Sequence, residues 1–294
     1  MNQERAKSFL LDLPSVQNDL PFSPALLTRL FRLTDDAATS PLTDVATAVA
    51  EDQGLSARLL AMANSAFYGL QAQVATVDRA VAVLGLREVR GLVLALGMRG
   101  LADVRPLPPE FALTPYLDHQ LAVGVTAMAL ARECAAMAPE DAFTAGLLHD
   151  LGKLVTALYR PDDWRAEAEL AAAQALAWHE AEECYWGLDH GLIGAMVLRA
   201  WNLPETLIEP VNWHHAPQAA PGDPAPSRLI GLADALVREH AETAPGEIVS
   251  PAPSEDFPDE PLALALGLTP QSAGDIARQA MARHDVAALA AALA

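Results

Sequence analysis

Apolar residues recur at the spacing of an α-helix along almost the whole chain, and no other feature constrains the fold as strongly. In residues 25–33, for example, Leu26 and Leu30 fall on one helical face. No stretch alternates apolar and polar residues in the manner of a half-buried strand. Only 5% of the residues are aromatic in a chain that is 52% hydrophobic, a composition that favours packed helices. The sequence therefore predicts an all-α protein with a sizeable core.

Two proline-rich stretches divide this helical pattern. Residues 105–109 read Arg-Pro-Leu-Pro-Pro and form the strongest internal break. Residues 243–261 are acidic and rich in proline, as in a linker or a surface loop. We therefore expect three segments, which are an N-terminal helical part over residues 1–105, a second helical part over residues 106–242, and the linker with short C-terminal helices over residues 243–294.

Local signals place several helix ends. Gly85 is expected to end one helix, because glycine readily adopts the backbone of a C-cap. Thr114, Asp189 and Ser227 are expected to cap the helices that follow them, because their side chains can accept from a free backbone N–H. Two further short helices are expected between residues 262 and 282.

The charge balance excludes two classes of partner. The chain carries 19 Lys and Arg residues against 38 Asp and Glu, a formal net charge of −19. Such a field repels nucleic acid and anionic membranes, so we expect neither as a partner. There is no N-terminal apolar signal segment, and no uncharged apolar run of the roughly 18 residues that a membrane span needs. Because Cys134 and Cys184 lack a CxxC spacing, we expect reduced thiols in a cytoplasmic protein.

A histidine and an aspartate stand side by side within the apolar stretch 145–154. Charged groups in such a stretch are costly to bury unless a partner compensates them, and a divalent metal is one natural partner of His149 and Asp150. On a continuous helix, Lys153 would share a face with His149 and could neutralise a bound phosphate. For an isolated pair, a core histidine bonded to its neighbour is the simpler interpretation, so this motif alone does not define a site.

The first part carries a long ordered motif. Residues 50–69 read AEDQGLSARLLAMANSAFYG, and residues 77–96 read VDRAVAVLGLREVRGLVLAL. Together they resemble the HDOD family of bacterial signalling proteins, whose phrase is close to DPxLxxRLLxxANSAxYG followed by AIxxLGxxxL. Gln53 departs from this phrase, since the family usually has proline there. A structural role accounts for the polar residues of the motif, because Asn64 can end a helix and Tyr68 can pack with its hydroxyl bonded.

The second part carries histidines and aspartates in a distinctive order. That order is His, His-Asp, His, His-His, Asp, and it resembles the HD superfamily of metal-dependent phosphohydrolases. In that superfamily the first His, the His-Asp pair and the last Asp hold a metal, and the intervening histidines hold a second metal in two-metal members. The resemblance implies a divalent metal such as Fe, Mn or Mg. The first ligand set would be His119, His149, Asp150 and Asp234, and the second would be His190 with His214 or His215.

The resemblance also implies a fold and candidate catalytic residues. It covers about residues 13–240 and implies an N-terminal HDOD half packed on an HD-like half. Asp150 would bridge two metals, and Lys153, which matches the HDxGK phrase, would meet a phosphoryl group. Adjacent helical residues diverge by about 100°, so we expect only one of His214 and His215 to point squarely at a shared site.

Two functions are compatible with these residues. HDOD proteins are generally regarded as non-catalytic relatives of the HD hydrolases. The Gly-Tyr-Pro phrase of cyclic di-GMP phosphodiesterases is absent after His215, where the chain continues Ala-Pro. We therefore expect a signal-transduction module that binds a signalling protein or a phosphate-bearing ligand without turnover and retains the metal site. The alternative is a metal-dependent phosphohydrolase, acting as a nucleotide or cyclic-nucleotide phosphodiesterase or as a phosphatase.

Overall fold

The computed structural model describes residues 5, 7–9, 11, 13–19, 24–34, 41–65, 68, 70, 72–240 and 259–283. Every regular element in these ranges is helical, which confirms the all-α prediction. In chain order the elements are α2 (Leu13–Asn18), α3 (Pro24–Thr34), α4 (Leu42–Ala50), α5 (Gln53–Ala63), α6 (Val77–Leu84), α7 (Leu86–Val104), α8 (Leu113–Cys134), α9 (Pro139–Leu148), α10 (Leu151–Tyr159), α11 (Pro161–Gln174), α12 (Trp178–Trp186), α13 (His190–Ala200), α14 (Glu205–Trp213), the 3-10 turn η1 (Pro217–Ala219), α15 (Ala225–His240), α16 (Asp259–Ala265) and α17 (Pro270–Arg283).

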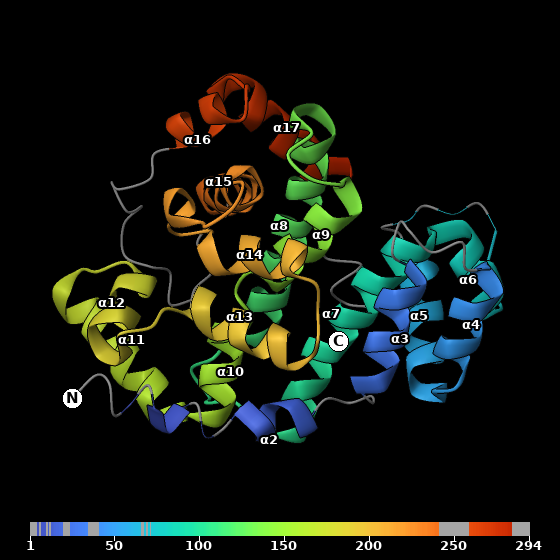
Figure 1. The fold of residues 1–294 in the computed structure, drawn as a ribbon, viewed down its shortest axis with the longest axis horizontal. Coiled ribbons are helices and arrows are strands. Elements are labelled where there is room, and N and C mark those ends of the chain that lie inside the picture. Colours follow the sequence, from blue (N-terminus) through green and yellow to red (C-terminus); the bar gives the residue numbers. More distant parts are fainter. Residues whose placement is uncertain are drawn as a thin grey trace.

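The helix pair α8 and α9 lies at the centre of the molecule (Figure 1). Helix α8 packs along α9, and α15 and α17 lie against α8. Helices α10, α13 and α14 pack in sequence on one another, and α14 also contacts α9 and α15. On the other side of α7, helices α3 to α6 pack together and lie apart from α13 to α15 (Figure 1).

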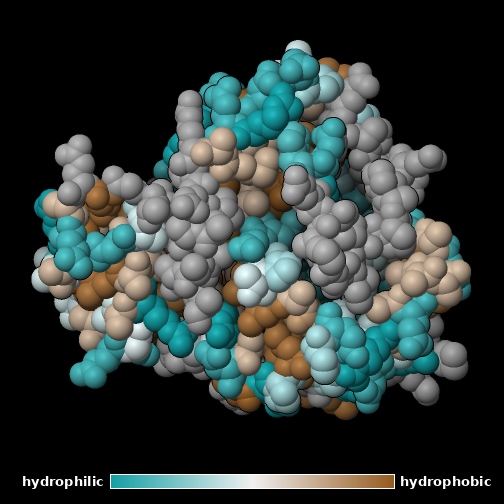
Figure 2. All heavy atoms as spheres, turned by 180° about the vertical axis from the view of Figure 1, so that it is seen from behind, coloured by the Kyte–Doolittle hydropathy of each residue, from teal (hydrophilic) through white to brown (hydrophobic). Residues whose placement is uncertain are grey.

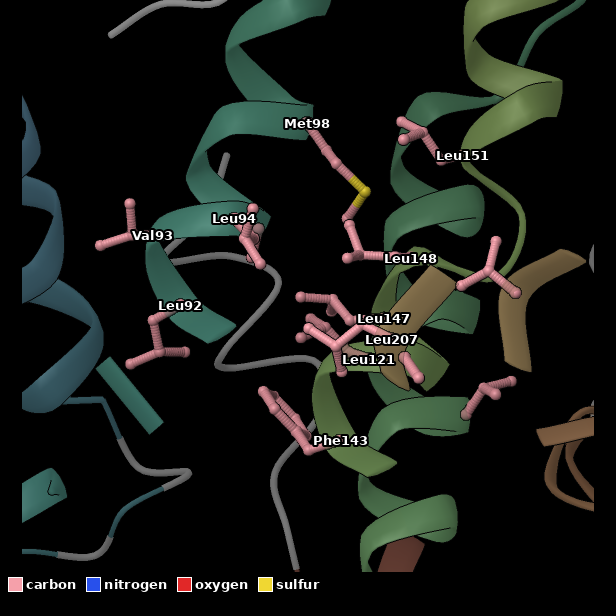
Figure 3. Packing of buried hydrophobic residues seen from close by; sticks show 14 of the residues in the cluster. Leu92, Val93, Leu94, Met98, Leu121, Phe143, Leu147, Leu148, Leu151 and Leu207 are labelled. Carbon is pink, nitrogen blue, oxygen red and sulfur yellow. The ribbon is translucent and has the colours of Figure 1, made fainter. Parts of the chain in front are cut away.

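Helix α7 is buried on two sides and connects the N-terminal helices to the centre. Leu92 and Val93 point toward the N-terminal helices, whereas Met98 points toward Leu148 of α9 (Figure 3). All four side chains are fully buried. The hydrophobic core therefore continues from one group of helices to the other through α7. The division of the chain into two helical halves at residue 105 stays a prediction.

Short-range hydrogen bonds fix the helix ends that the sequence predicts. Gly85, with a φ of +88°, ends α6, as expected. Asp189 caps α13 by accepting from the backbone N of Leu192 at 2.8 Å. Asn64 ends α5, and its side chain bonds both the N and the O of Val74, at 2.7 and 2.8 Å. Asn64 of the HDOD motif therefore has the structural role expected of it.

Two predicted caps are wrong. Helix α8 begins at Leu113 and α15 at Ala225, so Thr114 and Ser227 lie inside the first turns. Ser227 is buried and is the third residue of α15, whereas an N-cap precedes the first helical residue. In α8, the non-helical backbone that precedes the first turn belongs to Ala112 instead.

The N-terminal segment runs along helices of the second part. The ring of Phe9 meets that of Trp186 edge-on at a centroid distance of 6.0 Å. Asp19 accepts a hydrogen bond from the hydroxyl of Tyr159 at 2.8 Å and pairs with Nε of Arg105 at 2.8 Å. Helix α2 contacts α13. Residues near the start of the chain thus help to hold the helices that carry the site.

The two expected C-terminal helices are present as α16 and α17. Helix α16 begins at Asp259, slightly before the predicted start, and both helices pack on α15. Their outward side is largely hydrophilic, as the top of the molecule shows when seen from behind (Figure 2). Most of the predicted linker, residues 243–258, and the last residues of the chain, 284–294, lie outside the described residues. Within those described, no helix is both long and apolar enough to cross a membrane.

Candidate metal centre

The predicted histidines and aspartates converge although they are far apart in the sequence. His149 and Asp150 lie in the break between α9 and α10, where Asp150 has φ −100° and ψ 14°. His190 is the first residue of α13, and His214 follows the last residue of α14. The structure brings together the whole candidate set, which is His119, His149, Asp150, His190, His214, His215 and Asp234.

Asp150 divides this cluster into two subsites. Its Oδ2 lies 3.4 Å from Nε2 of His149 and 4.0 Å from Nε2 of His119. Asp234 closes this side, because its Oδ1 lies 3.1 Å from Nε2 of His119 and 3.6 Å from Nε2 of His149. We call this group the first subsite. It consists of His119, His149, Asp234 and Oδ2 of Asp150.

The other oxygen of Asp150 faces the remaining histidines. Oδ1 lies 2.9 Å from Nε2 of His190 and 3.9 Å from Nε2 of His214. Nε2 of His215 lies 2.8 Å from Nε2 of His190. We call Oδ1 of Asp150 and these three histidines the second subsite.

Both His214 and His215 offer a nitrogen to the second subsite, so the expectation that only one would do so is wrong. That expectation assumes a continuous helix. His214 keeps a helical backbone (φ −64°, ψ −25°), yet the centroids of the two rings lie 3.9 Å apart, so the side-chain torsions turn both rings toward the site.

Two buried histidines turn Nε2 toward the cluster. Nδ1 of His149 lies 2.7 Å from the carbonyl oxygen of Gly146, and Nδ1 of His214 lies 2.7 Å from that of Val211. A carbonyl oxygen can only accept, so Nδ1 carries the proton and donates it. Nε2 is therefore the ligand atom of both rings, which is the arrangement that orients histidine ligands of metals.

The residues present fit a divalent metal. Nε2 of His149, Nε2 of His214 and Oδ1 of Asp150 are buried and make no hydrogen bond within the described chain. Each such group costs about 1–3 kcal/mol if it stays unsatisfied, and a cation would satisfy all three. The 2.9 to 3.6 Å separations between facing ligand atoms suit atoms that share one ion at bond lengths of about 2.0–2.2 Å. Imidazole and carboxylate together suit a transition metal such as Fe or Mn better than Ca²⁺.

The electrostatics of the cluster keep both aspartates ionised. Burial is the largest influence on the pKa of Asp150 and acts to raise it, but His149 and Lys153 help to hold that pKa well below its usual range. Burial also acts to raise the pKa of Asp234, and Arg238 helps to reverse this and to hold it well below its usual range. Both carboxylates are therefore anionic, the form that binds a cation.

The histidines differ in protonation. Burial, with His149 and other neighbouring histidines, lowers the pKa of His214 well below its usual range, and burial with His214 does the same for His215. For His149, burial acts to lower the pKa, but Asp150 and Asp234 outweigh it and raise the pKa to about 9. His214 and His215 are thus neutral ligands, whereas a metal in the first subsite must displace a proton from His149.

Two cations already pair with the aspartates. Nζ of Lys153 lies 2.7 Å from Oδ2 of Asp150. Nε of Arg238 lies 2.8 Å from Oδ1 of Asp234, and its Nη2 contacts the other oxygen. Lys153 was expected to lie one helical turn from His149 on a shared helix. It does not, because the helix breaks at Asp150. Arg238 follows Asp234 by four residues on α15, a spacing from which the sequence could have predicted the pair.

Glycines at two helix crossings let the ligands approach one another. A Cβ on Gly152 of α10 would overlap the carbonyl oxygen of His190. A Cβ on Gly231 of α15 would lie 2.6 Å from the carbonyl oxygen of His214. Backbone therefore meets backbone where α10 crosses the start of α13 and where α15 crosses the end of α14.

Sequence reasoning missed two residues that support the second subsite. Glu182 of α12 accepts hydrogen bonds from the backbone N and from Nδ1 of His190, at 2.8 and 2.6 Å. The ring of His179 stacks on that of His215 at a centroid distance of 4.1 Å. Both stand in an amphipathic stretch with many glutamates, where nothing in the residue pattern marks them as buried.

The fold and the site define an all-α protein with a buried His/Asp cluster at its centre. The HDOD domain family matches residues 20–217, so the chain belongs to this family. A sequence relative, an uncharacterized protein of Treponema pallidum (strain Nichols), is 26% identical over 210 residues, 71% of this chain. The chain spans 40% of the length of that relative. The family match ends before α15, so Asp234 and Arg238 lie beyond it.

Solved structures share the fold. An HDOD domain protein of unknown function from Geobacter sulfurreducens has a TM-score of 0.74 at 21% identity, over 99% of this chain and 97% of its own. A protein named as a candidate phosphohydrolase, from Shewanella amazonensis SB2B, has a TM-score of 0.71 at 22% identity, over 96% and 98%. A candidate signal transduction protein from Marinobacter aquaeolei VT8 has a TM-score of 0.74 at 20% identity, over 100% and 66%. At such identities the likeness establishes the fold alone.

Proposed function

We propose that this chain is a cytoplasmic signal-transduction module that holds a divalent metal in its His/Asp cluster and recognises a protein partner or a phosphate-bearing ligand without turnover. The burial of the ligand set carries this proposal. The exposed fraction is 0% for His149 and His190, 3% for Asp150 and 4% for Asp234. Catalytic metal sites keep a position open to substrate, whereas closed ligand sets are typical of structural sites.

The cations at the edge of the cluster argue against turnover of a phosphoryl group. Lys153 and Arg238 are the partly exposed side chains through which a phosphate would approach. Each is already paired with a carboxylate, Lys153 with Asp150 and Arg238 with Asp234. A phosphoryl group would have to compete with these carboxylates for its counter-charge.

A metal in this cluster would act mainly on the fold. When bound, a divalent ion supplies concentrated positive charge to its ligands, and here those ligands come from α8, the α9–α10 junction, α13, the end of α14 and α15. Because ligands on separate helices are drawn together, metal binding adds directly to folding stability. Metal occupancy would therefore set how firmly these helices are held.

We assign the partner surface to the N-terminal helices, which carry the HDOD motif. Leu42 of α4 and Val83 of α6 are large apolar side chains exposed to solvent there. A full-length Leu42→Asp/Val83→Asp variant should lose capture of the partner from extracts of the native cell. Leu264→Asp, at a more exposed apolar position on α16, is the control and should retain it. Loss in the control but not in the double variant would move the surface to the C-terminal helices.

The absence of turnover is tested with the full chain loaded with Mn²⁺ or Fe²⁺ and a panel of nucleotides, cyclic nucleotides and phosphoesters. We expect no hydrolysis above background in the wild type. We expect Asp150→Ala to lower the metal-dependent part of the thermal stability. Metal-dependent hydrolysis that disappears in Asp150→Ala would refute the proposal, because a contaminating enzyme would not follow the substitution.

A second candidate function is metal-dependent phosphohydrolysis. Asp150 favours it, since its two oxygens face two separate sets of histidines, as a bridge between two metals does. In that case Lys153 would stabilise the developing phosphoryl charge. Lys153→Ala should then lower turnover and leave metal content unchanged, a combination that the binding module does not predict.

A further inference from the structure

Glu182 connects helix α12, which lies outside the cluster, to one of the cluster's histidines. Its Oε2 accepts from the backbone N and from Nδ1 of His190, at 2.8 and 2.6 Å. Its Oε1 accepts from Nε1 of Trp178 at 2.8 Å. Glu182 and His190 are both fully buried. Three donors thus fix the carboxylate, and the carboxylate fixes the orientation of His190.

This support differs from that of the other buried histidines. His149 and His214 donate from Nδ1 to carbonyl groups three residues earlier in the chain, those of Gly146 and Val211. Each of these two bonds spans three residues, so it forms together with the helix end to which it belongs. His190 depends instead on a side chain from another helix, and a carboxylate makes an imidazole a more basic ligand than a carbonyl does.

Helix α12 supports the second subsite at another point. The ring of His179 stacks on that of His215, with an angle of 14° between the ring planes. His215 in turn meets His190 through their Nε2 atoms. The ligands of the first subsite and the cations paired with them come from α8, the α9–α10 junction, α10 and α15. Both contacts made by α12 therefore act on the second subsite.

Helix α12, which carries Glu182, packs against α11 as a hairpin at one side of the molecule (Figure 1). Trp164 and Trp178 belong to a small apolar cluster separate from the main core. Glu167 of α11 accepts from Nε1 of Trp186, and burial, with Glu182 adding to it, raises the pKa of Glu167 to about 10. Glu167 is therefore neutral at pH 7.

We infer that Glu182 is a positioning residue for the second subsite. By accepting from Nδ1 it holds His190 with Nε2 toward Asp150, so α12 sets the affinity of the second subsite for a divalent metal. The first subsite shares Asp150 with the second, but its other ligands, His119, His149 and Asp234, come from helices other than α12. The inference rests on the proposed metal-binding function and adds to it a separate control of the two subsites.

Titration calorimetry of the metal-free full chain with Co²⁺ tests this separation. We expect two equivalents in the wild type. In Glu182→Gln, which keeps the side-chain size but lacks the charge, the first equivalent should bind as before and the second about 10- to 100-fold more weakly. Glu183→Gln replaces the next, exposed glutamate of α12 and should behave as the wild type. One equivalent in the wild type, unchanged binding in Glu182→Gln, or equal weakening of both equivalents would overturn the inference.

NMR of ¹⁵N-histidine-labelled, metal-free protein gives a second readout that a general loss of stability would not produce. In the wild type His190 should carry its proton on Nδ1, and Glu182→Gln should populate the other tautomer. A wild type that binds no Co²⁺ refutes the proposed function, whereas a wild-type His190 protonated on Nε2 alone refutes this inference. If Glu182→Gln does not fold, Trp178→Phe removes one donor to Glu182 together with part of a buried ring. A weaker second equivalent then supports the inference, and unchanged affinity overturns it.

Discussion

Replacing Gly152 by alanine should separate the two helices that meet at the centre of the cluster. The new Cβ would overlap the carbonyl oxygen of His190 and lie 2.8 Å from both its Cα and its carbonyl carbon. Non-bonded carbons prefer about 3.5–4.0 Å, so α10 and α13 must move apart by roughly 1 Å. His190 would then withdraw from Asp150, whose Oδ1 lies 2.9 Å from Nε2 of His190.

The expected cost follows from overpacking, which typically destabilises by about 1–3 kcal/mol. The gain in helix propensity from glycine to alanine offsets about 1 kcal/mol at most. Thermal denaturation by circular dichroism should therefore show a lower Tm, by roughly 2–4 °C for each kcal/mol in a chain of this size. Calorimetry with Co²⁺ should show weaker binding at the second subsite.

Gly194→Ala is the matched control for this substitution. Gly194 faces Gly152 from α13, and its Cβ would meet its nearest neighbours, Gly152 N and Val211 Cγ1, at 3.4 Å, which is ordinary contact. This variant should be at least as stable as the wild type. If Gly152→Ala matched Gly194→Ala in both Tm and metal affinity, the close backbone approach would not be what brings His190 to Asp150.

Two further predictions concern charged groups around the cluster. The folded state keeps a proton on Glu167 up to about pH 10, whereas the unfolded chain releases it near 4.5, so stability should fall as pH rises through this window, by about 1.4 kcal/mol per unit at most. Glu167→Gln should therefore have a higher Tm than the wild type at pH 8 and lose that advantage toward pH 5. Glu169→Gln, at an exposed position on the same helix, should have the Tm of the wild type at both pH values. An equal gain in Tm at both pH values for Glu167→Gln would contradict this prediction. Arg238→Met removes the arginine partner of Asp234, so the metal-free protein should lose stability, because the buried carboxylate keeps only its histidine neighbours. The same variant should bind metal more tightly at the first subsite, and weaker binding in calorimetry would argue that Arg238 helps to build the site.

The fold class could be predicted because the helical spacing of apolar residues is a local property of the sequence. Single caps such as Asp189 and the helix end at Gly85 were predictable for the same reason. The start of α15 was not, because Ser227 is buried by tertiary packing that no local pattern encodes. The division of the chain near residue 105 was predicted from a proline-rich stretch and stays a prediction, since α7 packs on both sides.

The ligand set could be predicted only through the order of its histidines and aspartates in a family resemblance. Backbone geometry alone misjudged His215, because it leaves out the side-chain torsions that bring the rings of His214 and His215 together. Glu182 was missed for a different reason. It resembles the half-buried Glu180 and the exposed Glu183 in sequence, and only the contact with His190 distinguishes the buried carboxylate from these neighbours.

The central claim is that the buried His/Asp cluster holds a divalent metal. An anomalous difference map from crystals of the full chain loaded with Mn²⁺ tests it most directly. We predict a peak in contact with Asp150 and with Nε2 of His149, and its loss in crystals of Asp150→Ala. A wild-type map without a peak in this cluster, or with Mn²⁺ bound only at the surface, would contradict the account.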